Sequence, residues 1–204
     1  MAPGKTEMAR GNIWKDFYTE KAREEKWLAR SVYKLEEIDK KYRIIRRNSR
    51  VLDLGCYPGS WSQFCIKRVG KGGEVVGLDL QRPERLSAKN YRFIEADILN
   101  LETGWLAREI GEMDLVISDL APQTTGNSLT DTSRSLALAE KALEIALTVL
   151  KGKGHFLCKV FEGGDLKHFR EGASRYFSRV RNIRPTAVRK RSREVYLLGL
   201  NLLK

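Results

Sequence analysis

The stretch RVLDLGCYPGSWSQFCIKRV, residues 50–69, indicates the fold of the whole chain. Its first half is a short apolar run that ends in a glycine, and its second half has the apolar spacing of a helix. Gly55 and Gly59 allow a tight turn between the two and let the backbone come close to a ligand. Ser60 is expected to cap the helix. A strand, a glycine turn and a helix in this order are typical of a parallel α/β sheet.

The alternation of short apolar segments with helical segments continues along the chain. Helices are predicted near residues 103–110, 132–150 and 165–177. Strands that alternate with helices predict a mostly parallel sheet with helices on both faces. The last two strands are separated only by a short basic loop, so we expect them to be antiparallel neighbours. The further predicted strands are EVVGLDL, YRFIEAD, MDLVISDL, GHFLCKVF, RVRNIRP and EVYLLGLNL.

The residues before the sheet are rich in charge and carry one apolar helical stripe, formed by Val32, Leu35, Ile38 and Tyr42. They predict two helices ahead of the first strand. The composition, 42% hydrophobic and 31% charged, suits one domain with a full-sized core. We therefore expect a single domain over residues 1–204, in which residues 1–48 form an N-terminal helical extension and residues 49–204 form the sheet core.

The chain is strongly basic, with 38 Lys and Arg against 26 Asp and Glu and a net charge of +12. This excess favours a polyanion, nucleic acid first, as the partner. The three cysteines show no CxxC spacing and only two histidines are present, so we expect a reducing compartment and no metal site. No signal segment or membrane-length apolar run is present, which predicts a cytoplasmic protein without a membrane partner. A monomer is the default expectation.

One ionisable residue lies near the end of each of the first five predicted strands: Asp53, Asp79, Asp97, Asp119 and Lys159. In open α/β sheets, ligands bind outside the carboxyl ends of the strands. A single aspartate at such a position is usually a cap or a turn former, whereas five ionisable residues favour a site. Lys159 lies inside an apolar strand, where an unpaired ammonium would be costly. Either its aliphatic stem lies on apolar surface while its ammonium reaches water, or the residue is functional.

The glycine turn lacks both the G-x-G-x-x-G fingerprint of dinucleotide-binding proteins and the phosphate-binding P-loop. Asp79 follows Gly55 by roughly the 20 residues at which an acidic residue meets a ribose in nucleotide-binding sheets. These two features indicate an adenosine ligand without a pyrophosphate, a description that S-adenosylmethionine meets. Asp79 is then predicted to bind the ribose and Asp97 the adenine amino group.

Five stretches of the chain, SVYKLEEID, VLDLGCYPGSWSQ, SDLAPQTTG, CKVFEGGD and RSREVYLL, resemble the FtsJ/RrmJ (RlmE) family of ribosomal RNA 2′-O-methyltransferases. The resemblance runs from about Arg30 to the C-terminus. It implies a Rossmann-like class I S-adenosylmethionine-dependent methyltransferase with a seven-stranded sheet and a Lys-Asp-Lys-Glu catalytic tetrad. Matching the motifs places the tetrad at Lys34, Asp119, Lys159 and Glu194, and the cofactor contacts at Gly55, Pro58, Gly59, Trp61, Asp79, Asp97 and Asp119.

Two loops depart from the pattern of that family. Its glycine turn usually reads G-A-A-P-G-G-W, whereas Cys56, Tyr57 and Ser60 stand here in place of two alanines and a glycine. The stretch SDLAP continues as QTTG, where the bacterial enzymes tend to have N-M-S-G. We expect the first difference to affect cofactor affinity and the second to affect the fit of the substrate.

The resemblance implies methylation of a ribose 2′-hydroxyl, that of a uridine in large-subunit (23S) ribosomal RNA within the 50S subunit. Transfer RNA is the alternative substrate, and a non-catalytic RNA-binding ribosome assembly factor is the alternative from another class. Lys159 can serve as the general base if burial and the neighbouring Lys34 favour its neutral form. A charged Lys159 can instead orient the 2′-oxygen. The sequence leaves both roles open.

Clusters of basic residues suit an RNA phosphate backbone. One lies before the core, from Lys15 to Arg30, a second lies at residues 43–47, and a third is RKRSR, residues 189–193. Trp14, Phe17, Tyr18 and Trp27 are interleaved with the first cluster, and they either stack on bases or dock the helix. The RNA contacts predicted beside the catalytic residues are Arg30, Arg189, Arg191 and Arg193.

Overall fold

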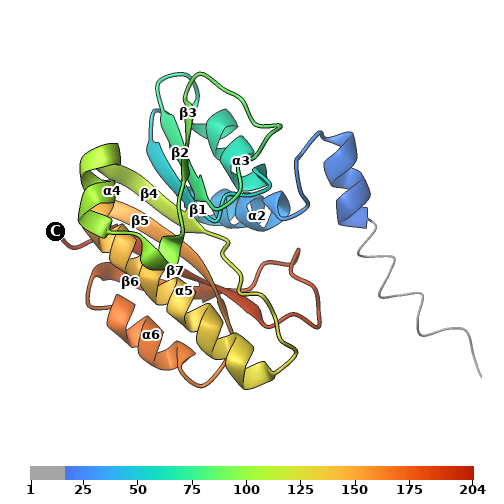
Figure 1. Ribbon diagram of the computed structural model, residues 1–204, viewed down its shortest axis with the longest axis vertical. Coiled ribbons are helices and arrows are strands. Elements are labelled where there is room, and N and C mark those ends of the chain that lie inside the picture. Colours follow the sequence, from blue (N-terminus) through green and yellow to red (C-terminus); the bar gives the residue numbers. More distant parts are fainter. Residues whose placement is uncertain (1–16) are drawn as a thin grey trace, which may run out of the picture.

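The computed structural model describes residues 17–204, and their strands form one seven-stranded sheet in the order β3-β2-β1-β4-β5-β7-β6 (Figure 1). The first five strands are parallel, and β7 pairs antiparallel with both β5 and β6. The predicted α/β class, the mostly parallel sheet and the antiparallel last pair are therefore confirmed. The strands are β1 (Arg50–Leu54), β2 (Glu74–Asp79), β3 (Tyr91–Glu95), β4 (Met113–Ser118), β5 (Leu150–Phe161), β6 (Phe177–Ile183) and β7 (Glu194–Leu202).

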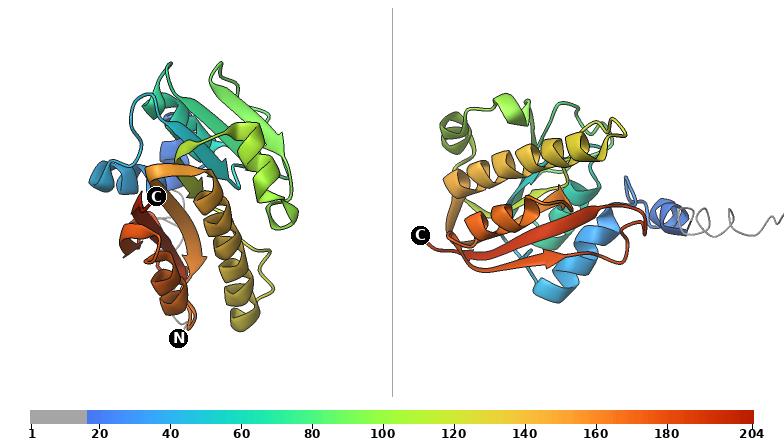
Figure 2. Two further views of the ribbon diagram at one scale, coloured as in Figure 1. Left: turned by 90° about the vertical axis from the view of Figure 1, so that its left-hand side faces the viewer. Right: turned by 90° about the horizontal axis from the view of Figure 1, so that it is seen from below.

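Helices cover both faces of the sheet (Figure 2). The α2 helix (Val32–Tyr42) and the α3 helix (Ser60–Val69) pack on one face, and α4 (Thr103–Ile110), α5 (Ser128–Val149) and α6 (Leu166–Ala173) pack on the other. A 3-10 turn, η1 (Ile98–Asn100), follows β3. Residues 17–24 are helical, so two helices precede β1 as predicted. Residues 1–16 of the predicted extension, which include Trp14 and Lys15, lie outside the described residues.

Each face of the sheet has its own apolar core, and β5 contributes to both. Phe156, Cys158 and Val160 lie in the core shared with α4, α5 and α6, and Leu157 lies in the core shared with α2 and α3. Lys159 follows Leu157 at the strand period of two and is only 6% exposed. The alternation predicted for this strand is confirmed, and it points the lysine to the α2 face.

Several boundaries differ from the sequence prediction. The α5 helix begins four residues early, at Ser128, because the Asn127 side chain accepts hydrogen bonds from the Leu129 and Thr130 amides and caps it there. Residue 177, predicted to end α6, instead begins β6. Packing explains this, since the Phe177 ring stacks on that of Phe156 at 6.1 Å.

The expected cap at Ser60 is wrong. Gly59, with a φ of 113°, occupies the N-cap position of α3, and no side chain caps that helix. The Ser60 hydroxyl instead hydrogen-bonds that of Ser31 at 2.9 Å. The start of α3 is thus tied to the residue that precedes α2.

Candidate active site

The strand order reverses between β1 and β4, the place where an open α/β sheet offers a crevice at the carboxyl ends of its strands. The glycine turn follows β1 and the SDLAP loop follows β4, so both lie at this crevice. Gly55 has a φ of 76°, and a Cβ there would lie 2.6 Å from the Leu120 side chain. A Cβ on Gly59 would lie 2.8 Å from the Leu28 side chain. Gly55 and Gly59, whose φ is 113°, both have a left-handed backbone that other residues rarely adopt, and these contacts add to the cost of a side chain there.

Asp79, at the end of β2, holds the glycine turn. One carboxylate oxygen accepts a hydrogen bond from the Tyr57 amide at 2.9 Å, and the other accepts one from the Gln81 amide at 3.1 Å. Each carboxylate oxygen keeps a lone pair free for a ligand hydroxyl. Asp97 has a local task as well, because its carboxylate caps η1 through the Leu99 amide and the Asn100 side chain.

Trp61 is buried beneath the turn rather than exposed in the crevice. The residue is 3% exposed, and the centre of its ring lies 5.8 Å from that of Tyr196. The indole nitrogen donates to the Ser31 carbonyl at 2.9 Å. Ser31 immediately precedes α2. Trp61 and Ser60, which both hydrogen-bond to Ser31, therefore fix the N-terminal end of α2, where Lys34 lies.

The structure brings the four predicted tetrad residues together as two lysine–carboxylate pairs. The Lys159 ammonium lies 3.1 Å from a carboxylate oxygen of Asp119 and donates to the Asp119 carbonyl at 2.5 Å. The Lys34 ammonium lies 2.6 Å from a carboxylate oxygen of Glu194. The second pair is partly buried, with side-chain exposures of 12% and 22%.

Tyr196 joins the two pairs, and sequence reasoning missed it. Its hydroxyl donates to the Asp119 carboxylate at 2.7 Å, and the Lys34 ammonium lies 5.8 Å from the centre of its ring. The residue also faces Lys159 across the β5–β7 pairing. A signal was available, because Tyr196 follows Glu194 by two residues and so shares its face of the strand.

Cations and a hydrogen bond set the charge of Asp119. Burial alone would raise the pKa of this carboxyl, but Lys159, Lys34 and the Tyr196 hydroxyl together bring the pKa below its usual value. Burial, together with the nearby Asp119 carboxylate, raises the pKa of Tyr196 well above its usual value. The phenol therefore stays protonated and donates to an ionised Asp119.

Asp53 departs from the predicted group of strand-end residues. It is fully buried, and one of its carboxylate oxygens accepts a hydrogen bond from Ser62 of α3 at 2.6 Å. The other oxygen has no hydrogen-bond partner. Burial raises the pKa of Asp53 to about 7 in spite of the bond from Ser62. The side chain lies under α3, so the expectation that all five residues share one open site is wrong for Asp53.

A hollow of about 420 Å³ opens beside the Lys34–Glu194 pair. Three of the four arginines predicted to contact RNA line it: Arg30, Arg189 and Arg191. Arg30 is held by the Ala187 carbonyl at 3.1 Å. Arg193 turns away, because its guanidinium donates to Thr132 at 3.1 Å and to the Ser128 carbonyl at 3.3 Å, both at the start of α5.

A larger hollow, of about 1030 Å³, lies on the outer side of the glycine turn. Tyr57, which is 52% exposed, lines it together with Arg23, Lys26 and Trp27. Trp27 packs 6.0 Å from the ring of Phe64, with the Lys67 ammonium 3.9 Å from its own ring. These contacts give Trp27 a role in docking the N-terminal segment. Residues 17–204 contain no group of three or more His, Cys, Asp or Glu placed to hold a metal ion.

Comparison with known proteins gives a consistent result. The model of the FtsJ-like methyltransferase family matches residues 27–202. The ribosomal RNA large subunit methyltransferase E of Desulfosudis oleivorans is 42% identical over 197 residues, which cover 97% of this chain and 95% of that protein. Its namesake from Desulfotalea psychrophila is 45% identical, with 93% and 96% covered. A crystal structure from Plasmodium falciparum, provisionally assigned as a ribosomal RNA methyltransferase, superposes with a TM-score of 0.77 at 26% identity and covers 87% of this chain and 99% of that one.

Proposed function

The chain belongs to the FtsJ-like methyltransferase family, and we propose that it methylates the ribose 2′-hydroxyl of a uridine in 23S ribosomal RNA within the large ribosomal subunit. S-adenosylmethionine is the methyl donor of this family. The names of the relatives support the RNA substrate. The observation that carries the proposal is the pair of lysine–carboxylate contacts joined by Tyr196 at the sheet crevice.

The residues around the glycine turn fit S-adenosylmethionine. Asp79 offers a carboxylate for the ribose hydroxyls, and Asp97 lies after the neighbouring strand, where we propose that it meets the adenine. Gly55, Pro58 and Gly59 would supply the close backbone, with Trp61 supporting it from below. When bound, the cofactor supplies an electrophilic methyl group to the oxygen that the protein presents to it.

Lys159 is the side chain best placed to present that oxygen. An ammonium has three N–H donors, and contacts to the Asp119 carboxylate and carbonyl use two of them. The third would hold the ribose 2′-oxygen and aim its lone pair, which supplies rate through orientation. The ion pair with Asp119 favours this orienting role over that of a general base. Lys34 and Glu194 would hold the ribose from the side of the hollow.

The three arginines of the 420 Å³ hollow would bind the RNA beside the lysines. Arg30, Arg189 and Arg191 surround the Lys34–Glu194 pair. Guanidinium groups pair well with phosphate oxygens, so the phosphates that flank the methylated nucleotide would lie here. Arg193, bound to α5, would instead fix the loop that carries Arg189 and Arg191.

The test is transfer of labelled methyl groups from S-adenosylmethionine to large ribosomal subunits purified from cells that lack the enzyme. Wild type, Lys159→Ala and the exposed control Lys167→Ala are compared. We expect wild type and the control to leave label in an alkali-resistant dinucleotide, and Lys159→Ala to leave none.

Two outcomes would contradict the proposal. Label found in transfer RNA but not in ribosomal RNA would establish the alternative substrate. Cofactor binding without label on subunits, free ribosomal RNA or transfer RNA would support a non-catalytic assembly factor.

A further inference from the structure

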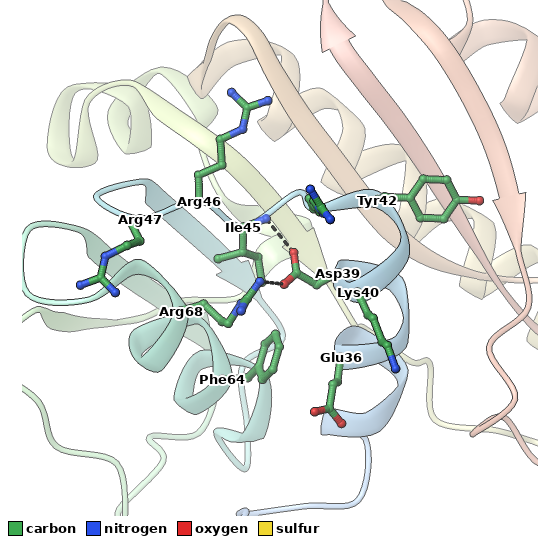
Figure 3. Close-up of a pocket in the computed structure, with 10 residues that line it drawn as sticks. Glu36, Asp39, Lys40, Tyr42, Ile45, Arg46, Arg47, Phe64 and Arg68 are labelled. Carbon is green, nitrogen blue, oxygen red and sulfur yellow. Dashed lines mark hydrogen bonds and ion pairs between the residues drawn. The ribbon is translucent and has the colours of Figure 1, made fainter.

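A third hollow, of about 750 Å³, lies at the C-terminal end of α2 (Figure 3). Lys34 lies near the other end of that helix. The hollow is formed by the last turns of α2, the loop that follows them and one side of α3, and Phe64 contributes to its wall. Basic side chains dominate its lining, with Glu36 and Asp39 as the only carboxylates. We call it the arginine hollow, and its five cations are Lys40, Arg43, Arg46, Arg47 and Arg68.

A buried carboxylate holds the arginine hollow in shape. Asp39 is 1% exposed, accepts a hydrogen bond from the Ile45 amide at 2.9 Å and pairs with Arg68 at 2.8 Å. Arg43 adopts a left-handed conformation at the end of α2, and its amide donates to the Asp39 carbonyl at 2.7 Å. The loop between α2 and β1 is therefore fixed to both helices before any ligand arrives, which lowers the entropy cost of binding.

The positive charge of the arginine hollow is not neutralised from within. Of its five cations, only Arg68 has a carboxylate partner among residues 17–204. Arg43, Arg46 and Arg47 are exposed and make no side-chain ion pair within that range. Like charges held together in this way repel one another, and a polyanion relieves the repulsion. The geometry therefore points to an anionic ligand.

We propose that the arginine hollow binds the phosphodiester backbone of the substrate RNA, at a distance from the nucleotide that is methylated. This inference rests on the proposed function and adds a second RNA contact to it. The cations come from three segments, α2, the loop and α3, and their spread suits successive phosphates better than one small anion.

The α2 helix sets the separation of the two RNA contacts. Lys34 lies near its start and Arg43 at its end, which at 1.5 Å per residue is about 14 Å along the helix axis. At about 3.4 Å per stacked nucleotide, this distance corresponds to about four nucleotides. One nucleotide cannot reach both ends, so the protein would select an RNA whose backbone passes along α2.

The test uses the double variant Arg46→Gln/Arg47→Gln. Its matched control is Lys167→Gln/Arg170→Gln, which removes the same charge from α6 on the other face of the sheet. Arg46→Lys/Arg47→Lys keeps the charge in place. Binding to free large-subunit ribosomal RNA is measured by filter retention at several salt concentrations, and KM and kcat for methyl transfer are measured separately.

We expect the glutamine variant in the arginine hollow to bind RNA about tenfold more weakly and to reduce the salt slope by about 2, because two phosphate contacts are lost. KM for RNA should rise while kcat stays within about twofold, and the lysine variant should restore most of the affinity. The α6 control should retain wild-type RNA affinity and salt slope.

Equal loss of RNA binding in the α6 control, or wild-type binding by the glutamine variant, would overturn the inference. Stabilisation by inorganic phosphate that depends on Arg46 and Arg47, with RNA binding unchanged, would also overturn it, by assigning the hollow to a free anion. RNA binding is measured without catalysis. A failure of the proposed methyl transfer can therefore be distinguished from a failure of the arginine hollow to bind RNA.

Discussion

The ends of β1 and β4 lie side by side, and an aspartate lies at each, but the charges of the two aspartates differ. Asp53 faces α3, receives one hydrogen bond and has a pKa of about 7. Asp119 faces two lysines and a tyrosine hydroxyl, and its pKa lies below the usual value. Desolvation acts to raise the pKa of both carboxyls, so the two lysines and the Tyr196 hydroxyl make the difference. Two similar strand ends thus yield a packing residue that is only partly ionised near neutral pH and a fixed negative charge at the candidate site.

Asp119→Asn should produce the largest effect, because it removes that fixed charge. The Lys159 ammonium would remain buried without its partner, at a cost of about 3–5 kcal/mol in the free energy of unfolding. Loss of the lysine's orientation should also lower kcat by a factor of about 100 or more. Urea unfolding and the methyl-transfer assay measure the two losses, and near-wild-type activity would show that Asp119 does not act through Lys159.

The pH dependence of stability tests the other half of the comparison. The pKa of Asp53 is about 7 in the folded protein and has its ordinary value of 3.8 in the unfolded chain, so the folded state holds an extra proton between these pH values. Stability therefore falls as pH rises from about 4 to 7 and levels off above that, by up to about 4 kcal/mol from this group. Asp53→Asn should remove this decline.

The measurement for Asp53 is the free energy of unfolding of wild type and Asp53→Asn at pH 5, 6, 7 and 8. We expect the free energy of unfolding of the variant to rise relative to that of wild type as pH increases. Methyl transfer should be retained. Parallel curves for the two proteins would mean that Asp53 is already ionised in the folded state.

Tyr196→Phe tests the link between the two lysine–carboxylate pairs. The change keeps the ring packed on Trp61 but removes the hydroxyl that donates to Asp119. A hydrogen bond to a charged group contributes about 1.5–3 kcal/mol, so we expect kcat to fall about tenfold and stability to fall by about 2 kcal/mol. Unchanged kcat together with lower stability would give the hydroxyl a purely structural role.

Ser62→Ala should have the smallest effect. It removes the hydrogen bond that Asp53 accepts at 2.6 Å, for which we expect a loss of about 1 kcal/mol in stability. Since that bond lowers the pKa of Asp53, the decline of stability with pH should extend to higher pH in the variant. A shift in the opposite direction would mean that Ser62 does not stabilise the ionised form of Asp53.

The sequence predicted the sheet and the helices on its faces, and matching family motifs selected four residues whose side chains lie together in the structure. Apolar periodicity specifies strands and helices locally, and motif spacing locates the ends of strands. Asp53 could not be distinguished from Asp79 in this way, because the direction of a side chain at a strand end depends on where the glycine turn begins. The direction of the Arg193 side chain could not be predicted for a similar reason, since its hydrogen-bond partners belong to α5, more than 60 residues away in sequence.

The position of β7 in the sheet has a consequence for synthesis of the protein. This strand carries Glu194 and Tyr196, yet it is inserted between β5 and β6, both of which leave the ribosome before it. Until it inserts, β5 has an open edge and Lys34 lacks its carboxylate partner. A chain in which β7 has not yet inserted therefore lacks both the Lys34–Glu194 pair and the Tyr196 bond to Asp119, so we expect it to be unable to modify RNA.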